Sequence, residues 1–369
     1  MVLQTSPTSG QLLHFNASSE SEPPEMPSLN PFFVPMQRAS VEIQAKIWSQ
    51  ILYFAMCCPQ REENAITGRL WPNRITGPRL PMLLVSKTFL KLGLPHFHAH
   101  IWLRSVSKEA LYTALQSGTL KPMQTFTTRV EIPMSTVIAI AQHSGNCLAV
   151  MRLAIQDQPL SQPESTRVFS EFSTIKRLHW KGVVPFNLEP NARCPPDSLS
   201  KLEFLSMKQM DPSLVTILAG LALPAIRVLR CAPPSNSRPG CPLEWEPLLR
   251  AHGKKLSEVQ LTVGVLGEIC EQLILLDLCP NLTSLEIITY RATHLAAPPS
   301  TTIFTAQHPR LSLTKLKCTI PNWPQKRTAG AEIMLRWGVF LSAFDLGTAT
   351  RASVPNLREI SCCQWPIHE

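Results

Sequence analysis

Three histidines are the residues of this chain whose types and spacing best suit metal chemistry. His96, His98 and His100 stand at every second position of the segment 95–103, which alternates polar and apolar residues. If this segment is a strand, as the alternation predicts, the three side chains share one face. Zinc sites usually recruit a fourth ligand, and no Cys or acid stands at a useful spacing nearby. The alternative is a solvated strand face, and we expect no bound metal.

Catalysis has no candidate residues in this sequence. The motifs G-x-x-x-x-G-K-[ST], G-x-G-x-x-G, G-x-S-x-G and H-E-x-x-H do not occur. Asp and Glu are too dispersed to suggest a pair of catalytic carboxylates. The 11 cysteines are scattered without C-x-x-C pairs at zinc spacing, which favours buried, reduced thiols over a disulfide framework or a metal site. We therefore expect a protein that is not an enzyme and needs no cofactor.

Composition indicates a folded chain with a mild positive charge. Its 369 residues are 44% hydrophobic and 17% charged, which is typical of globular proteins. Without an apolar run of about 18 residues or a secretory signal, we expect no membrane span and a cytoplasmic or nuclear location. Lys and Arg outnumber the acids by 35 to 26. They are spread along the chain, mostly as isolated pairs, so a nucleic-acid partner is not favoured.

A short apolar pattern recurs along the chain from residue 150 onward. Apolar residues stand at the first, fourth and sixth positions of each copy, as in Val150, Leu153 and Ile155. Successive copies begin 24 to 31 residues apart, except that the last follows after 44 residues. This spacing is close to the roughly 20–29 residues of leucine-rich repeats. The copies begin at Val150, Ile175, Leu202, Ile226, Leu256, Leu282, Leu313 and Leu357.

Helices are expected between the copies. Asp211 and Pro212 supply an N-cap and a first-turn proline for a helix through Leu221. Strand followed by helix at near-constant spacing predicts parallel strands with right-handed crossovers. The fold class is therefore α/β, with a leucine-rich-repeat-like solenoid and a curved parallel sheet over 105–369. The other helices are expected over 107–116, 135–143, 243–251, 266–278 and 331–346, with a further strand over 128–132.

The N-terminal part has a different organisation. Residues 1–35 are rich in Ser, Pro, Glu and Thr and are expected to be a disordered tail. Residues 36–104 form a helical module with a polar insert over 59–79. Its first helix begins at the N-cap Ser40 and carries apolar residues at steps of three or four, and its second runs from Leu80 to Gly93 and Pro95. Two short helices with wide apolar faces need a partner.

This module resembles an F-box, particularly the fungal form with a long insert. Glu42-Ile43 and Ile47-Trp48 match the opening helix of that family, and Val85-Ser86-Lys87 followed by Phe89 matches its second segment. Ala39-Ser40 stands where the family has Leu-Pro, which bears on affinity for the adaptor. A repeat array behind the module is the common companion in F-box leucine-rich-repeat proteins.

The resemblance implies a substrate-recognition subunit of an SCF-type cullin-RING ubiquitin ligase. The module would insert into a Skp-family adaptor, since a few apolar anchors usually supply most of such binding energy. For each of these residues, the alternative interpretation is a place in the protein's own core. For Ile51 and Leu92 the adaptor-binding and core interpretations are equally favoured. The expected adaptor-binding residues are Ile43, Ile47, Trp48, Ile51, Val85, Phe89 and Leu92.

An unknown protein substrate would lie on the strand-lined face of the array. Strand alternation points Leu178 and Trp180 inward, with Arg177 and His179 outward. Mixed charge on the outward set favours a protein over a polyanion, although solvated surface is the alternative for each residue. An alternative function is an interaction scaffold whose drifted F-box joins no ligase. The expected substrate-binding residues are Arg177, His179, Phe204, Arg230, Lys315 and Lys317, and the same register exposes Glu258 and Glu286.

Overall fold

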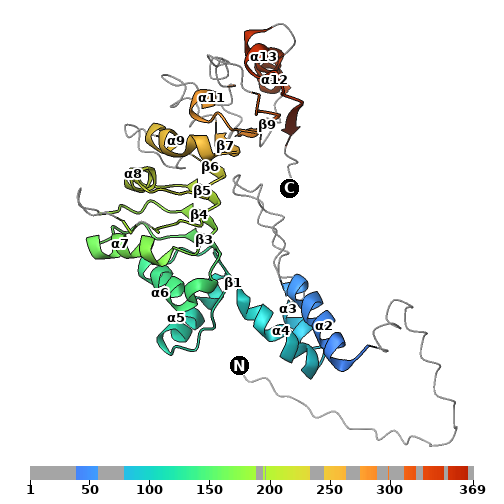
Figure 1. Ribbon diagram of the computed structural model, residues 1–369, viewed down its shortest axis with the longest axis vertical. Helices are drawn as coiled ribbons and strands as arrows, with labels where there is room; N and C mark the ends of the chain where they lie inside the picture. Colours follow the sequence, from blue (N-terminus) through green and yellow to red (C-terminus); the bar gives the residue numbers. More distant parts are fainter. Residues whose placement is uncertain are drawn as a thin grey trace, which may run out of the picture. The chain divides into compact units, whose positions relative to one another are not determined.

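The structure is a computed structural model, and its main feature is one parallel sheet. It describes residues 39–56, 79–187, 194–195, 197–232, 245–262, 275–288, 298, 311–320, 327–344 and 348–364. Ten strands of this part pair in sequence order from β1 to β10 (Figure 1). They are β1 (His100–Leu103), β2 (Thr125–Thr128), β3 (Val150–Ala154), β4 (Arg177–Lys181), β5 (Phe204–Lys208), β6 (Val228–Ala232), β7 (Glu258–Thr262), β8 (Ser284–Ile288), β9 (Lys315–Ile320) and β10 (Glu359–Gln364).

The recurring apolar pattern is what places these strands. Each of its eight copies contains one of the strands β3 to β10, so the expected α/β fold with a parallel, solenoid-like sheet is confirmed. In β4 the side chains of Leu178 and Trp180 are buried, whereas those of Arg177, His179 and Lys181 are half-buried on the opposite face. Side chains thus alternate between two faces of the sheet. The face of Leu178 and Trp180 is here called the core face, and the opposite face, with Arg177 and His179, is called the open face.

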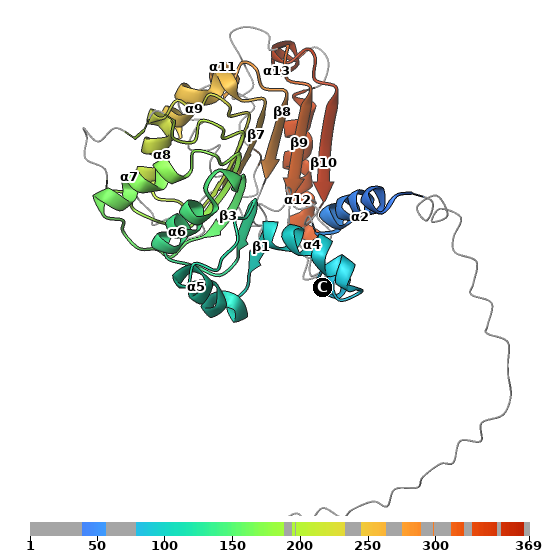
Figure 2. The ribbon, with the colours of Figure 1, turned by 60° about the horizontal axis from the view of Figure 1, so that its bottom comes forward.

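Helices cover the core face of the sheet. Figure 2 shows α6, α7, α8 and α9 on one side of the strands. Their apolar side chains and those of the strands form one buried cluster. As expected, Asp211 caps α8, because its Oδ1 accepts a hydrogen bond of 2.9 Å from the Ser213 N–H. These helices are α5 (Lys108–Gln116), α6 (Met134–Ser144), α7 (Gln162–Glu171), α8 (Pro212–Gly220), α9 (Glu246–His252) and α11 (Leu275–Leu278).

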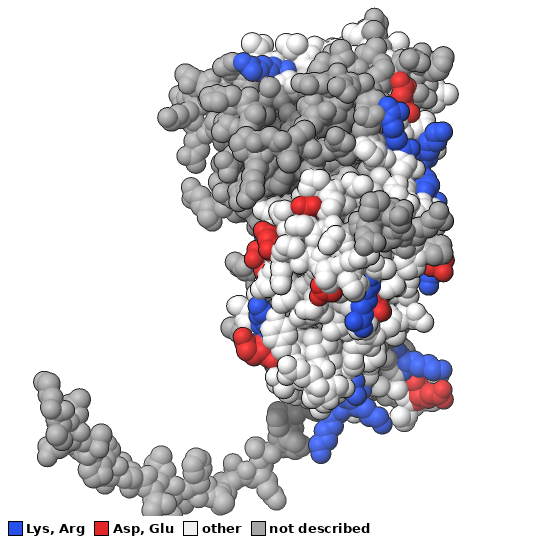
Figure 3. Space-filling view, turned by 90° about the vertical axis from the view of Figure 1, so that its left-hand side faces the viewer, with Lys and Arg blue, Asp and Glu red and all other residues white. Residues whose placement is uncertain are grey.

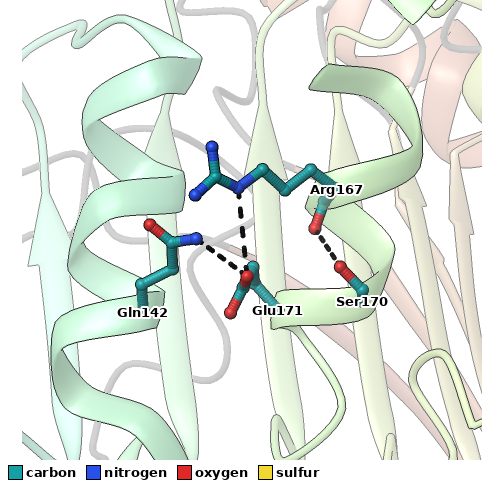
Figure 4. Close-up of polar contacts among 4 residues, drawn as sticks. All are labelled: Gln142, Arg167, Ser170 and Glu171. Atoms are coloured by element: carbon teal, nitrogen blue, oxygen red, sulfur yellow. Dashed lines mark hydrogen bonds and ion pairs between the residues drawn. The ribbon is translucent and has the colours of Figure 1, made fainter. Parts of the chain in front are cut away.

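Helix α7 was missing from the sequence-based expectation, although the sequence carries its start signal. Ser161 and Glu164 form a capping box, in which the Ser161 N–H donates to Glu164 Oε2 at 3.1 Å. The helix packs beside α6, where Gln142 Nε2 donates to Glu171 Oε1 at 2.8 Å (Figure 4). Arg167 Nε lies 4.0 Å from the same oxygen. The start of the helix is therefore readable from the local pattern S-x-x-E.

The 44-residue step before the last copy holds two helices. They are α12 (Arg327–Ser342) and α13 (Ala349–Ser353), between β9 and β10. Trp337 and Phe340 of α12, together with Phe344, are buried in the same cluster as the strands. The expected helix over 331–346 is therefore present, and of the helix expected over 266–278 the described part is α11.

The segment with the three histidines differs from its expected form. The second helix is divided into α3 (Arg79–Leu83) and α4 (Lys87–Ala99), and Ser86 caps α4 by accepting the Phe89 N–H at 3.1 Å. Helix α4 continues through Gly93 and Pro95, so His96 and His98 are helical and β1 begins only at His100. The strand expected over 95–103 is present only over His100–Leu103, so the prediction that the three histidines share one strand face is wrong.

The beginning of the sheet also differs from expectation. Strand β2 begins at Thr125 and ends at Thr128, so the strand expected over 128–132 was placed three to four residues too late. Beyond β2, an isolated bridge joins Ile132 to Ile155. Strand β1 pairs with β2 in parallel. The first strand of the sheet therefore lies at the end of the segment 36–104.

The chain divides into two compact units, Met1–Gln50 and Ile51–Glu369. Of the first, the described part is the beginning of helix α2 (Val41–Met56), where Ser40 Oγ accepts the Ile43 N–H at 3.4 Å. In the second, Leu52, Met56 and Leu83 form a small buried cluster, here called the helical cluster. The tail expected over 1–35 and the insert expected over 59–79 lie outside the described residues, apart from Arg79. None of the described helices has the length and apolar character to cross a bilayer.

Candidate functional site

Large apolar side chains remain exposed on helix α2 and just before helix α4. Ile43 and Ile47 are 51% and 37% exposed, and Ile51 and Val85 are 45% and 67% exposed. Ile43, Ile47 and Ile51 follow one another at four-residue steps, so they share one face of α2. Such a row of apolar residues on one helix face, in contrast to single scattered residues, is typical of a protein-binding surface.

The other expected adaptor-binding residues are less accessible. Trp48 is half-buried. Phe89 and Leu92 are half-buried and pack against the helical cluster, so they help to hold α4 in place. Gly93 allows this close packing, because a Cβ atom there would lie 2.6 Å from Leu83 Cδ2.

The structure adds apolar residues that the sequence interpretation left out. Leu80 and Leu84 were assigned to one helix with Val85, but α3 ends at Leu83 and α4 begins after the Ser86 cap. The apolar stripe expected on one helix over 80–95 is therefore divided between α3, the bend that follows it, and α4. The signal that could have shown the break is the N-cap serine itself. The additional exposed residues of these helices and the bend between α3 and α4 are Val41 (83%), Phe54 (66%), Leu80 (57%), Leu84 (73%), Leu90 (42%) and Leu94 (39%).

On the open face of the sheet, residues far apart in sequence stand in rows. One row, here called the central row, takes one residue from each of the strands β1 to β9. Because adjacent parallel strands lie about 4.8 Å apart, each member neighbours the next. The members are Trp102, Thr127, Arg152, His179, Ser206, Arg230, Gln260, Glu286 and Lys317.

Four of the expected substrate-binding residues meet around one aromatic ring. Phe204 of β5 is 3% exposed. The Cζ atoms of Arg177 and Arg230, from the strands on either side, lie 4.6 Å and 4.9 Å from its ring centroid. The ring of His179 has its centroid 4.7 Å from that of Phe204. Cation–π contacts therefore hold the two guanidinium groups next to each other despite their like charge.

Positively charged side chains act on the imidazole ring of His179. Burial, followed by the charges of Arg152, Arg177 and Arg230, holds the pKa of His179 well below its ordinary value. Its Nε2 atom is buried and makes no hydrogen bond within the described part of the chain. His179 is therefore neutral near pH 7.

Two lysines extend the positive charge along β4 and β5. Lys181 and Lys208 are neighbours in the register of these strands. Burial and the charge of Lys181 lower the pKa of Lys208. The sequence interpretation named neither lysine and did not name Arg152, although the repeat pattern with its strand alternation places all three on this face. We call Arg152, Arg177, Arg230, Lys181 and Lys208 the basic cluster.

The remaining expected residues, Lys315 and Lys317, lie apart from the basic cluster. Both are on β9, three strands beyond Arg230. Lys317 Nζ lies 2.9 Å from Glu286 Oε1, and Lys315 Nζ lies 3.2 Å from Glu359 Oε2. Glu286 also accepts hydrogen bonds from Gln260 Nε2 at 2.7 Å and Thr319 Oγ1 at 2.8 Å. The expected set thus divides into four residues around the Phe204 ring on β4–β6 and two lysines on β9 that lie next to carboxylates.

A shallow pocket of about 490 Å³ opens beside the ring of Phe204. Its wall combines basic and apolar groups with two carboxylates. Both carboxylates belong to exposed residues at the beginnings of β5 and β7. The pocket is lined by Arg177, Phe204, Arg227, Arg230, Glu203 and Glu258.

The helical side of the sheet has a different surface. Figure 3 shows acidic and basic groups interspersed over its middle part, on a largely uncharged background.

Comparison of the chain with protein-family models, with curated proteins and with solved structures finds no match. The site is therefore interpreted from its residues alone.

Proposed function

We propose that this protein is a non-catalytic, F-box-type substrate-recognition subunit that joins a cullin-RING ubiquitin ligase through a Skp-family adaptor. The observation that carries the proposal is that both segments that resemble the F-box family, α2 and the residues before α4, each leave large apolar side chains exposed. Val85 is the best example, since it is 67% exposed although it stands in the segment that most resembles the F-box family. Soluble proteins leave such residues exposed in groups chiefly where a partner covers them.

The energetics of helix docking support this proposal. Burying an exposed Val or Ile side chain contributes about 1.5–3 kcal/mol. A few such anchors account for most of the affinity in helix-mediated interfaces. Phe89 and Leu92 would act indirectly, because their contacts with the helical cluster keep α4 in position to present Val85.

The open face of the sheet would then receive the protein substrate. It places residues from many strands in rows, and repeat proteins use such faces for extended binding. Four of the proposed substrate-binding residues, namely Arg177, His179, Phe204 and Arg230, stand together on this face. The leucine-rich-repeat identity of the array belongs to the same proposal.

The test is direct binding of the full chain to a purified Skp-family adaptor, measured by isothermal titration calorimetry. We expect a one-to-one complex that Ile47→Asp combined with Val85→Asp weakens by about tenfold or more, because two buried anchors would become charged. Both residues are exposed, so the variant should fold, which circular dichroism would verify.

The matched control is Leu335→Asp in α12, since Leu335 is 70% exposed and lies outside the resembling segment. It should bind the adaptor as the unmodified chain does. Absence of binding by the unmodified chain would reject ligase membership and favour the alternative, an interaction scaffold with a drifted F-box. Equal weakening by the control variant would show that the loss is nonspecific.

A further inference from the structure

Positive charge on the open face is concentrated over four adjacent strands. Arg152 lies on β3, Arg177 and Lys181 on β4, Lys208 on β5 and Arg230 on β6. Three strand spacings span about 14 Å, which equals the length of about four residues of extended chain. No two of these residues are closer than four positions in the sequence, and only the register brings them together.

From this arrangement we infer that the basic cluster binds an acidic segment of a protein partner, an extended run of Asp and Glu residues. The inference deepens the proposed function, on which it rests for its biological role, by naming the class of substrate that the open face accepts. Binding itself requires only the sheet.

The width of the basic cluster favours a run of carboxylates over a single anion. Its charges are distributed over several strands, so one compact group could contact only part of it. Guanidinium groups suit carboxylates because their planar fork matches the two oxygens. Arg177 and Arg230 are also restrained on the ring of Phe204, so less side-chain freedom is lost when they bind.

The surroundings of the cluster disfavour a nucleic acid. Phe204 is 3% exposed beneath two arginines, so a base cannot stack on its face. Glu203 and Glu258 line the adjacent pocket and would repel a continuous phosphate backbone. A peptide avoids this repulsion, because a neutral or basic residue can stand next to its acidic run and face these carboxylates.

The pKa of His179 provides a second measure of whether an acidic peptide occupies the basic cluster. Burial, and then the charges of three arginines of the basic cluster, lower the pKa of His179. Carboxylates bound among them would offset this effect and raise the pKa of His179 again. Glu286, the next acid along the central row, is held by Lys317, Gln260 and Thr319, so it does not reach this histidine as a competing anion.

The test measures fluorescence anisotropy of a fluorescein-labelled peptide with six Glu residues between Gly-Ser flanks, added to the full chain. We expect saturable binding with a Kd of about 100 µM or tighter, weakened as salt rises because the Debye length shortens. The same peptide with six Gln residues should not bind. Arg177→Gln combined with Lys181→Gln should weaken binding by about tenfold.

The matched control is Lys121→Gln combined with Lys254→Gln, which removes two positive charges from exposed positions outside the basic cluster and should leave the Kd unchanged. As a second measure, NMR titration of the His179 ring should show a higher pKa with the Glu peptide than without it. Failure of the Glu peptide to bind, or equal weakening by the control, overturns the inference.

Two further probes test the choice of ligand. Tighter binding of a 12-nucleotide single strand of DNA would identify a nucleic-acid surface instead. At least tenfold tighter binding of a peptide with one phosphoserine in place of the six Glu residues would identify a phosphate site. Adaptor binding is measured separately on α2 and α4 variants, so loss of one interaction with retention of the other distinguishes this inference from the proposed function.

Discussion

The guanidinium group of Arg177 lies over the ring of Phe204, with its Cζ atom 4.6 Å from the ring centroid. Arg230 covers the same ring from the next strand at 4.9 Å. Two like charges are thereby fixed on a nearly inaccessible aromatic residue in the middle of an open sheet face. In this arrangement the ring provides the apolar support for both guanidinium groups.

The first prediction concerns this contact. In a double-mutant cycle with Arg177→Gln and Phe204→Leu, we expect a coupling free energy of about 0.5–1 kcal/mol. Leucine keeps much of the apolar volume but lacks the ring quadrupole. Urea unfolding of the four proteins provides the measurement. A coupling indistinguishable from zero would mean that the ring and the guanidinium group contribute independently.

The second prediction concerns pH. Burial and three arginines lower the pKa of His179 in the folded state, so the unfolded chain binds a proton more readily. The free energy of unfolding should therefore fall as the pH decreases from about 6.5, the ordinary histidine value, toward the lower folded pKa.

His179→Gln should make the free energy of unfolding less dependent on pH in this window, as followed by thermal unfolding between pH 5 and 8. His98→Gln, which changes a histidine of α4 outside the basic cluster, is the control variant. An unchanged pH profile for His179→Gln would contradict the prediction.

The third prediction concerns Gly182, which follows β4 with φ +149°. A Cβ atom there would lie 2.6 Å from the carbonyl oxygen of Ile155. Gly182→Ala should lower the free energy of unfolding by about 1–3 kcal/mol through backbone strain alone, with a further loss from the close contact. Gly220→Ala at the end of α8 meets no atom within 4 Å and should be neutral or stabilising by up to about 1 kcal/mol. Chemical denaturation would compare the two variants.

The fourth prediction compares two ion pairs on β8–β10. Glu286 accepts hydrogen bonds from two side chains besides pairing with Lys317, and its side chain is 15% exposed. Glu286→Gln should lower stability by about 1.5–3 kcal/mol. Lys315 and Glu359 are 60% and 57% exposed, so Lys315→Gln should change stability by less than about 1 kcal/mol. Equal losses in urea unfolding would contradict this ranking.

Several parts of the fold follow from local patterns. Apolar residues at three fixed positions recur in each copy, and period-two alternation then decides which strand residues join the core. Leu178 and Trp180 therefore could be placed inside, with Arg177 and His179 outside. The start of α8 was equally readable, because Asp211 and Pro212 satisfy local requirements of a helix N-terminus.

The N-terminal helices show where local patterns fail. Alternation over 95–103 suggested a strand, yet His96 and His98 are helical because α4 continues through Pro95. Phe89 and Leu92 were assigned to adaptor binding together with Val85. However, Phe89 and Leu92 pack against the helical cluster, whereas Val85 is exposed. Burial depends on neighbours that lie elsewhere in the chain, so residue type alone does not decide it.

By itself, the sequence determined the repeating strands, their core and open faces, and the positions of most helices, since each depends on residues within one repeat. Only the tertiary structure decided that Arg152, Arg177 and Arg230 become neighbours while Lys315 and Lys317 pair with acids farther along the sheet. The physical reason is the register, because parallel pairing brings together residues about 25 to 30 positions apart in the sequence. The interaction between two charges depends on their distance in space, which the separation along the chain does not give.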